Sequence, residues 1–278
     1  MSVEHRVDSG GVEIVYDSHG PDDGPVVLLL HGWPDSARLW RHVVPALVDA
    51  GHRVLTPDMR GYGRSAKPAE VDAYNLLVVA NDVTAVLDDA GAATARVVGH
   101  DWGAALTWGY ATLAPDRVER MVAVSVGHPS AFAAAGTPQR EKSWYMLLFQ
   151  VEGVAERWLS ADDWAGFREW SGHPEADAAI AAWEADGSLT PSLCWYRASM
   201  PPEAFVGPPI QLPPVPVPAM GVWSSDDFAI LEAQMSTSGD HCGAGFRYER
   251  IEGVGHWIPL EAPEALTPLL LDFLGDQE

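Results

Sequence analysis

An aspartate stands at the centre of the segment Gly99-His100-Asp101-Trp102-Gly103. Small residues on both sides let a backbone turn sharply and expose the central side chain above a sheet edge. A carboxylate is already ionised at neutral pH, so it attacks carbon without a base to remove a proton. Attack at an alkyl carbon leaves an ester that water can cleave, whereas attack at an acyl carbon gives an anhydride. The segment predicts a nucleophilic aspartate, although five such residues alone could also form an ordinary turn.

An ester on the nucleophile turns over only if another group activates water against it. His256 follows the last predicted strand and opens the final predicted helix, and Asp226 and Asp227 follow the preceding strand. The chain order is therefore nucleophile, acid, histidine, an order typical of enzymes with a nucleophile at a strand–turn–helix elbow. We predict that His256 is the base and that Asp227 orients it, with Asp226 as the alternative.

The loop after an early apolar run reads His31-Gly32-Trp33-Pro34. In enzymes with a nucleophile elbow, this loop supplies one backbone N–H to the oxyanion that forms during the reaction, and the residue after the nucleophile supplies the other. The predicted oxyanion hole therefore consists of the N–H groups of Trp33 and Trp102. Pro34 has no N–H, and the bond before it is a candidate for a cis peptide.

Strand and helix signals alternate in the elements that must position these groups. The alternation predicts an α/β fold with a mostly parallel, doubly wound sheet. Continuous apolar runs such as residues 26–30 indicate strands buried on both faces. The expected elements are a hairpin at 3–7 and 12–16, strands at 26–30, 53–55, 96–98, 121–126, 219–223 and 246–251, and helices at 36–47, 72–89, 104–108 and 263–274.

The alternation stops between residues 128 and 214, where helical stretches rich in tryptophan replace strand-like runs. We therefore expect a core formed by residues 1–127 and 215–278, interrupted by a helical cap at 128–214. The proline-dense stretch 207–218 is typical of a stiff linker back to the core. Most of the cap tryptophans are expected to fill its small core, because large aromatic side chains generally do so.

Length and composition suit one large α/β domain with an insertion. The chain has 278 residues, of which 47% are hydrophobic and 20% charged, and its net charge of −22 argues against nucleic acid or an anionic membrane as partner. We found no signal-like or membrane-length apolar run, and we expect a cytoplasmic protein. Cys194 and Cys242 lack metal-ligand spacing, so free thiols and no metal are expected, with one disulfide as the alternative. A homo-oligomer is compatible with the sequence.

The motifs resemble the epoxide hydrolase branch of the α/β-hydrolases over nearly the whole chain. Residues 31–34 look like the oxyanion loop of that family, and residues 58–65 are similar to its next turn. Residues 98–103 resemble its nucleophile segment, residues 227–228 its acid site and residues 255–257 its base site. The resemblance implies an α/β-hydrolase fold with a helical cap. It also implies a small apolar epoxide and water as substrates, and no cofactor.

Two cap segments carry the resemblance further. Residues 144–150 and 195–198 are similar to the segments that hold the two tyrosines with which epoxide hydrolases bind the epoxide oxygen, which implicates Tyr145 and Tyr196. Ring opening generates an alkoxide, a poor leaving group that needs hydrogen bonds and finally a proton. Phenols can supply both because they stay protonated at neutral pH. Two tyrosines could otherwise simply pack within the cap.

Two rival functions remain. A haloalkane dehalogenase would use the same Asp, His and acid but bind a halide, with Trp102 as one donor; its second donor is often an Asn where this chain has Trp33, or else a cap tryptophan. A non-catalytic ligand-binding protein of this fold would have no need for an intact nucleophile, acid and base. The paired tyrosines favour hydrolysis of an epoxide to a vicinal diol through a hydroxyalkyl ester on Asp101.

Overall fold

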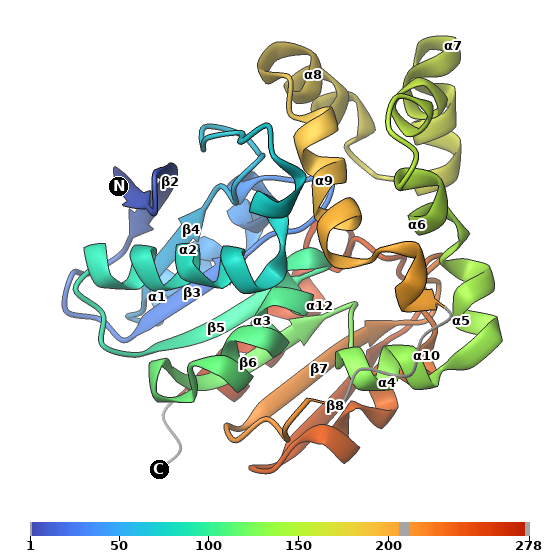
Figure 1. The fold of residues 1–278 in the computed structure, drawn as a ribbon. Coiled ribbons are helices and arrows are strands. Elements are labelled where there is room, and N and C mark those ends of the chain that lie inside the picture. Colours follow the sequence, from blue (N-terminus) through green and yellow to red (C-terminus); the bar gives the residue numbers. More distant parts are fainter. Residues whose placement is uncertain (1, 206–211, 276–278) are drawn as a thin grey trace.

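The computed structural model describes residues 2–205 and 212–275, and an eight-stranded sheet runs through its centre (Figure 1). The strand order is β1-β2-β4-β3-β5-β6-β7-β8. β2 is antiparallel to both of its neighbours, and the remaining pairs are parallel. The strands are β1 (Val3–Ser9), β2 (Val12–His19), β3 (Val26–Leu30), β4 (Arg53–Pro57), β5 (Ala95–His100), β6 (Val118–Val124), β7 (Ala219–Ser224) and β8 (Phe246–Ile251). The predicted mostly parallel sheet is confirmed.

Helices connect the strands and cover both faces of the sheet. In the core these are α1 (Val44–Asp49), α2 (Leu76–Asp89), α3 (Trp102–Leu113), α10 (Glu232–Ser236), α11 (Ile258–Glu261) and α12 (Pro263–Leu274). Short 3-10 helices η1 (Ala37–His42), η2 (Val71–Tyr74), η3 (Pro115–Arg117) and η5 (Thr237–His241) accompany them.

Two predicted helices are divided in the structure. The helix expected at 36–47 is a 3-10 helix, η1, followed by α1, which has Pro45 in its first turn. Proline has no N–H and clashes with the preceding turn, so Pro45 fits only where a new helix begins. The helix expected at 72–89 starts at Leu76, because the Asn75 side chain caps it by accepting from the Leu77 N–H.

Alternate residues of the buried strands face two separate apolar clusters. Val27 and Leu29 of β3 pack in one cluster with η1, α1 and α12. Leu28 and Leu30 pack in the other cluster with α2, α3 and several residues that follow β6. Successive side chains of a strand point to opposite faces, so a strand covered on both sides must be apolar throughout. This explains the continuous run at residues 26–30.

Between β6 and β7, the regular elements of the part that the structure describes are all helices joined by loops. We call residues 128–214 the helical insertion; Figure 1 shows its α6, α7, α8 and α9 gathered beyond one end of the sheet. Its elements are α4 (Pro129–Ala134), α5 (Gly136–Lys142), α6 (Trp144–Phe149), α7 (Val154–Ser171, kinked at 161–164), α8 (Ala176–Asp186), α9 (Leu189–Ser199) and η4 (Pro202–Phe205). Part of the predicted linker, residues 207–211, lies outside the described residues. The division into core and cap stays a prediction.

Candidate active site

The predicted nucleophile lies in a sharp turn between β5 and α3. Asp101 has φ +53° and ψ −119°, a backbone conformation that L-residues adopt only under constraint. The constraint comes from close packing of the flanking glycines. A Cβ atom on Gly99 would lie 2.1 Å from the Gly103 carbonyl oxygen, and one on Gly103 would lie 2.2 Å from the Leu30 carbonyl oxygen. Glycine at both positions therefore allows the strand and helix to meet and leaves the Asp101 carboxylate projecting from the turn.

The predicted oxyanion loop reaches Asp101 from the neighbouring strand. The chain runs from β3 to β4 on one side and then to β5 on the other, so the loops after β3 and β5 meet where the strand order reverses. The Trp33 N–H donates to Asp101 Oδ1 at 2.7 Å. A Cβ atom on Gly32 would lie 2.3 Å from that oxygen and 2.6 Å from the Trp102 nitrogen. The loop therefore brings both predicted donors beside Asp101, and its Trp33–Pro34 peptide is cis.

The predicted base and acid also meet at this edge. His256 Nδ1 lies 2.7 Å from Asp227 Oδ2, and His256 Nε2 lies 3.6 Å from Asp101 Oδ2. The other oxygen of Asp227 accepts from the N–H groups of Ala229 and Ile230, both at 2.8 Å. These two N–H groups fix the orientation of the Asp227 carboxylate, so that its second oxygen faces His256.

Asp226, the alternative acid, takes a different position. Its side chain is exposed and accepts from the Ser225 hydroxyl at 2.9 Å. Within the described residues, Asp227 is the acid of this pair that contacts His256. Adjacent residues at the end of a strand point in different directions, and that alternation separates the two carboxylates.

Electrostatics at the site favour a charged histidine beside two carboxylates. Burial lowers the pKa of His256, but the charges and hydrogen bonds of Asp227 and Asp101 outweigh burial and raise it to about 10. His256 is therefore protonated at neutral pH and lies between the side chains of Asp227 and Asp101. The pKa of this histidine depends directly on the charge of the predicted nucleophile, because the two side chains are 3.6 Å apart.

Tyr145 on α6 and Tyr196 on α9 lie together on the insertion side of the site. Their rings are edge to face with centroids 6.1 Å apart, and Tyr196 is also edge to face with Trp102 at 4.9 Å. Burial, as the larger cause, and the negative charge of Asp101, as the second, raise the pKa of both phenols well above the ordinary value. Both side chains are therefore hydrogen-bond donors over the whole neutral range.

A cavity of about 840 Å³ joins the predicted nucleophile and the two tyrosines. Asp101, Trp102, Tyr145 and Tyr196 all line it. Its remaining wall is mostly apolar and comes largely from α2, α3 and the insertion, including Leu76, Leu113, Phe132, Met146, Met200 and Phe205. An apolar cavity with a few polar groups converging at one point is typical of a site for a small organic ligand. These wall residues are scattered along the chain and had no signal in the sequence.

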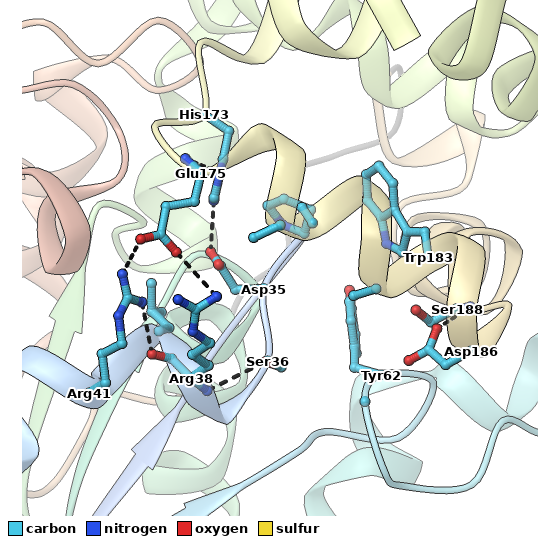
Figure 2. A pocket seen from close by; sticks show the side chains of 16 residues that line it. Asp35, Ser36, Arg38, Arg41, Tyr62, His173, Glu175, Trp183, Asp186 and Ser188 are labelled. Atoms are coloured by element: carbon cyan, nitrogen blue, oxygen red, sulfur yellow. Dashed lines mark hydrogen bonds and ion pairs between the residues drawn. The ribbon is translucent and has the colours of Figure 1, made fainter. Parts of the chain in front are cut away.

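A smaller cavity of about 150 Å³, lined by both charged and apolar side chains, lies beside the oxyanion loop (Figure 2). His173 Nε2 lies 3.3 Å from Asp35 Oδ2, and Glu175 forms ion pairs with Arg38 and Arg41. These contacts join the loop between α7 and α8 to the segment that directly follows Trp33 and Pro34. The insertion is thus fixed to the core beside the predicted oxyanion hole.

A second set of contacts, from α5, holds the loop that carries Asp227. Gln139 is buried; its side-chain amide donates to the Ala229 carbonyl at 2.9 Å and accepts from the Leu231 N–H at 2.8 Å. Lys142 Nζ donates to the Asp227 carbonyl at 2.8 Å. Sequence reasoning missed both residues, because a glutamine and a lysine on a short amphipathic helix look like surface residues.

Comparisons with known proteins identify the family of this chain. A family model described as the alpha/beta hydrolase fold matches residues 25–263. Epoxide hydrolase A of Mycobacterium tuberculosis is 31% identical, with 99% of this chain and 98% of that protein covered. An AB hydrolase superfamily protein of Bacillus subtilis is 30% identical, with 98% and 97% covered. A solved structure of epoxide hydrolase A from Mycobacterium thermoresistibile is 30% identical, has a TM-score of 0.83, and covers 100% of this chain and 99% of that one.

The chain belongs to the α/β-hydrolase fold family and is a hydrolase. Within that family its likeness is to the epoxide hydrolase branch, as the sequence motifs predicted. A further solved structure, of epoxide hydrolases from metagenomes of hot environments, matches the whole of both chains at 30% identity with a TM-score of 0.87. In the described part of the chain, the structure has no helix that is both long and apolar enough to cross a membrane.

Proposed function

We propose that this protein hydrolyses an apolar epoxide to a vicinal diol through an ester on Asp101. One observation carries the proposal: a single apolar cavity is lined by an ionised carboxylate at a nucleophile turn and by two buried, protonated tyrosines. An epoxide needs a nucleophile at carbon and a proton donor at oxygen at the same time. The names of the relatives point to the same substrate class.

In the first step, Asp101 Oδ2 attacks one ring carbon and the bond from that carbon to the epoxide oxygen breaks. The Trp33 N–H already occupies Oδ1, so Oδ2 is the oxygen free for attack. Tyr145 or Tyr196 donates its proton to the departing oxygen, which becomes the first hydroxyl of the product. One proton then passes from the His256 imidazolium to the tyrosinate, and the site is left with a neutral ester and a neutral histidine.

In the second step, His256 removes a proton from water, which attacks the ester carbonyl carbon. The negative charge develops on Oδ1, 2.7 Å from the Trp33 N–H, and the adjacent Trp102 N–H is placed to share it. The tetrahedral intermediate collapses by breaking the bond between the acyl carbon and the oxygen that attacked the ring. That oxygen takes the second proton of the water and leaves in the diol, and Asp101 regains its charge. The water oxygen stays in the carboxylate, and the proton remains on His256.

The charges at the site set the order of the two chemical steps. In the free enzyme, Asp227 and Asp101 together hold His256 protonated, so the base is inactive. Forming the ester removes the negative charge beside Nε2, and the pKa of His256 must fall. The histidine therefore becomes a base only after there is an ester for it to hydrolyse.

Covalent trapping tests the proposal. His256→Gln removes the base, so we expect it to gain the whole mass of styrene oxide on Asp101 and to retain it. Peptide mapping locates the adduct, and the double variant with Asp101→Ala is the control that should gain nothing. Gain of a phenylethyl group from phenylethyl bromide, with no adduct from the epoxide, would instead identify a haloalkane dehalogenase. No adduct from either reagent would rule out the covalent mechanism and favour a ligand-binding protein.

Isotope labelling tests the order of the steps. During a single turnover of the unmodified protein in oxygen-18 water, the label should enter Asp101 and be absent from the first diol released. Direct attack of water on the epoxide would place the label in that first diol, and would contradict the ester intermediate even if product forms.

A further inference from the structure

Ser125, which follows β6, has an unusual backbone and a buried hydroxyl. Its φ is +69°, in the left-handed region that few non-glycine residues adopt, and its side chain has no exposed surface. The conformation is held from both sides: the Ser125 N–H donates to the Val222 carbonyl at 2.8 Å, and the Gln234 side chain donates to the Ser125 carbonyl at 3.1 Å. Strained backbone of this kind persists only where the surroundings fix it.

The result of this conformation is a hydrogen bond to the main chain of the predicted base. Ser125 Oγ donates to the His256 carbonyl at 2.8 Å. The same carbonyl accepts from His100 Nε2 at 3.0 Å. A carbonyl has no proton to give, so His100 must carry its hydrogen on Nε2, and both lone pairs of the His256 oxygen are occupied. Burial, followed by proximity to His256, lowers the pKa of His100 to about 4, which keeps it neutral in this role.

These two bonds connect the base to the strand ends that carry the nucleophile. His100 directly precedes Asp101 at the end of β5, and the Asp101 N–H donates to the carbonyl of Val124, the residue before Ser125. The position of the His256 main chain relative to Asp101 is thus set by the ends of β5 and β6. The Asp227 bond to Nδ1 fixes the rotation of the ring, but it does not fix the main chain from which the ring projects.

We propose that Ser125 is a positioning residue for the second chemical step: it holds the His256 main chain so that Nε2 faces water at the Asp101 ester. The inference rests on the proposed function. Its consequence is selective, because Asp101 attacks the ring without help from a base. Loss of the Ser125 hydroxyl should therefore slow hydrolysis of the ester and leave formation of the ester almost unchanged.

The test measures the two steps separately. Rapid-quench mass spectrometry follows the Asp101 adduct of styrene oxide as it forms and decays in the unmodified protein and in Ser125→Ala. We expect the rate of adduct formation to stay within about twofold and the rate of decay to fall on the order of ten- to hundredfold, the range expected for misplacing a reacting group by a fraction of an ångström to an ångström. The adduct should accumulate in the steady state.

Two controls separate positioning from stability. Ser125→Gly relaxes the positive φ but also lacks the hydroxyl, so it should be more stable than Ser125→Ala and just as slow in hydrolysis. Ser65→Ala removes another buried hydroxyl, which donates to the Asp58 backbone carbonyl at 2.5 Å. Ser65 and Asp58 are far along the chain from the loop that carries His256. Ser65→Ala should lower the melting temperature without changing the ratio of the two rates.

Each outcome has one interpretation. Equal slowing of both steps, unchanged decay in Ser125→Ala, or recovery of decay in Ser125→Gly would overturn the positioning role. If His256→Gln gives no adduct, the proposed function fails and the inference fails with it. If His256→Gln traps the adduct while Ser125→Ala hydrolyses it normally, the inference alone is wrong.

Discussion

The charge of Asp101 should control whether His256 can act as a base, and Asp101→Asn isolates this effect. Asparagine keeps almost the shape of aspartate but carries no charge, so it reproduces the electrostatic state of the ester without any substrate. The pKa of His256 is raised to about 10 in the unmodified protein, where burial opposes the two carboxylates. With Asp227 left in place and burial unchanged, the variant should lose only the Asp101 contribution.

The distance gives the size of this contribution. Unit charges separated by 3.6 Å, the Nε2–Oδ2 distance, interact by about 4.6 kcal/mol at an effective dielectric constant of about 20. A thousandfold change in proton affinity corresponds to about 4.1 kcal/mol. We therefore expect the proton affinity of His256 to fall by about a thousandfold, which carries its pKa from about 10 to the neighbourhood of neutrality.

The assay is an NMR titration of the imidazole resonances, with His256→Gln used to assign the signal. Asp226→Asn is the matched control: it removes an exposed carboxylate next to Asp227 and should leave the titration of His256 unchanged. Intact mass verifies that the amide persists. A His256 pKa that stays near 10 in Asp101→Asn would refute the idea that ester formation switches the base on, because Asp227 alone would then hold the proton.

Three other perturbations follow from the geometry. Tyr145→Phe and Tyr196→Phe, each made with His256→Gln, should slow adduct formation about ten- to hundredfold, and the double replacement should abolish it on the same timescale. Gly32→Ala should reduce turnover at least about a hundredfold in steady-state assays, since its Cβ would lie 2.3 Å from Asp101 Oδ1. Burial and the adjacent imidazole of His241 lower the pKa of His128 to about 4. The neutral His128 side chain therefore stabilises the folded protein fully above about pH 6.5, and this stabilisation is lost as the pH falls toward 4. When the pH is lowered from 7 to 5, the free energy of unfolding measured in urea should therefore fall by about 1–2 kcal/mol less in His128→Asn than in the unmodified protein.

The architecture was predictable because its strands are buried on two faces. A run such as residues 26–30 has no helical period and no polar face, so it fits the middle of a doubly wound sheet. Helix boundaries were predicted less accurately where a single residue, and not the apolar periodicity, determines where a helix begins. Pro45 divides one predicted helix, and the Asn75 cap moves the start of another. By contrast, β8 and α12 begin and end where the sequence placed them, at residues 246–251 and 263–274.

The residues that bear on the chemistry differ in how visible they are in a sequence. Asp101 directly follows β5, within a motif whose Gly99 and Gly103 allow close backbone approach, and His256 lies in the loop after β8, between a glycine and a tryptophan. Ser125 has no such motif. Its importance depends on a positive φ and on a carbonyl 131 positions away, and neither is encoded locally. Long-range hydrogen bonds of this kind become visible only when the fold brings the segments together.

In the proposed mechanism the insertion serves both chemical steps through one short piece of chain, and this restricts how it can move. Helix α6 carries Tyr145, the proposed proton donor, and α5 just before it holds the Asp227 loop through Gln139 and Lys142. Displacing α5 and α6 as a lid would break these bonds, each worth roughly 0.5–3 kcal/mol, and would disturb the acid that orients His256. Substrate is therefore expected to enter along the cavity between α2, α3 and α9, past Leu77 and Leu113, whose exposed apolar side chains suit an apolar epoxide.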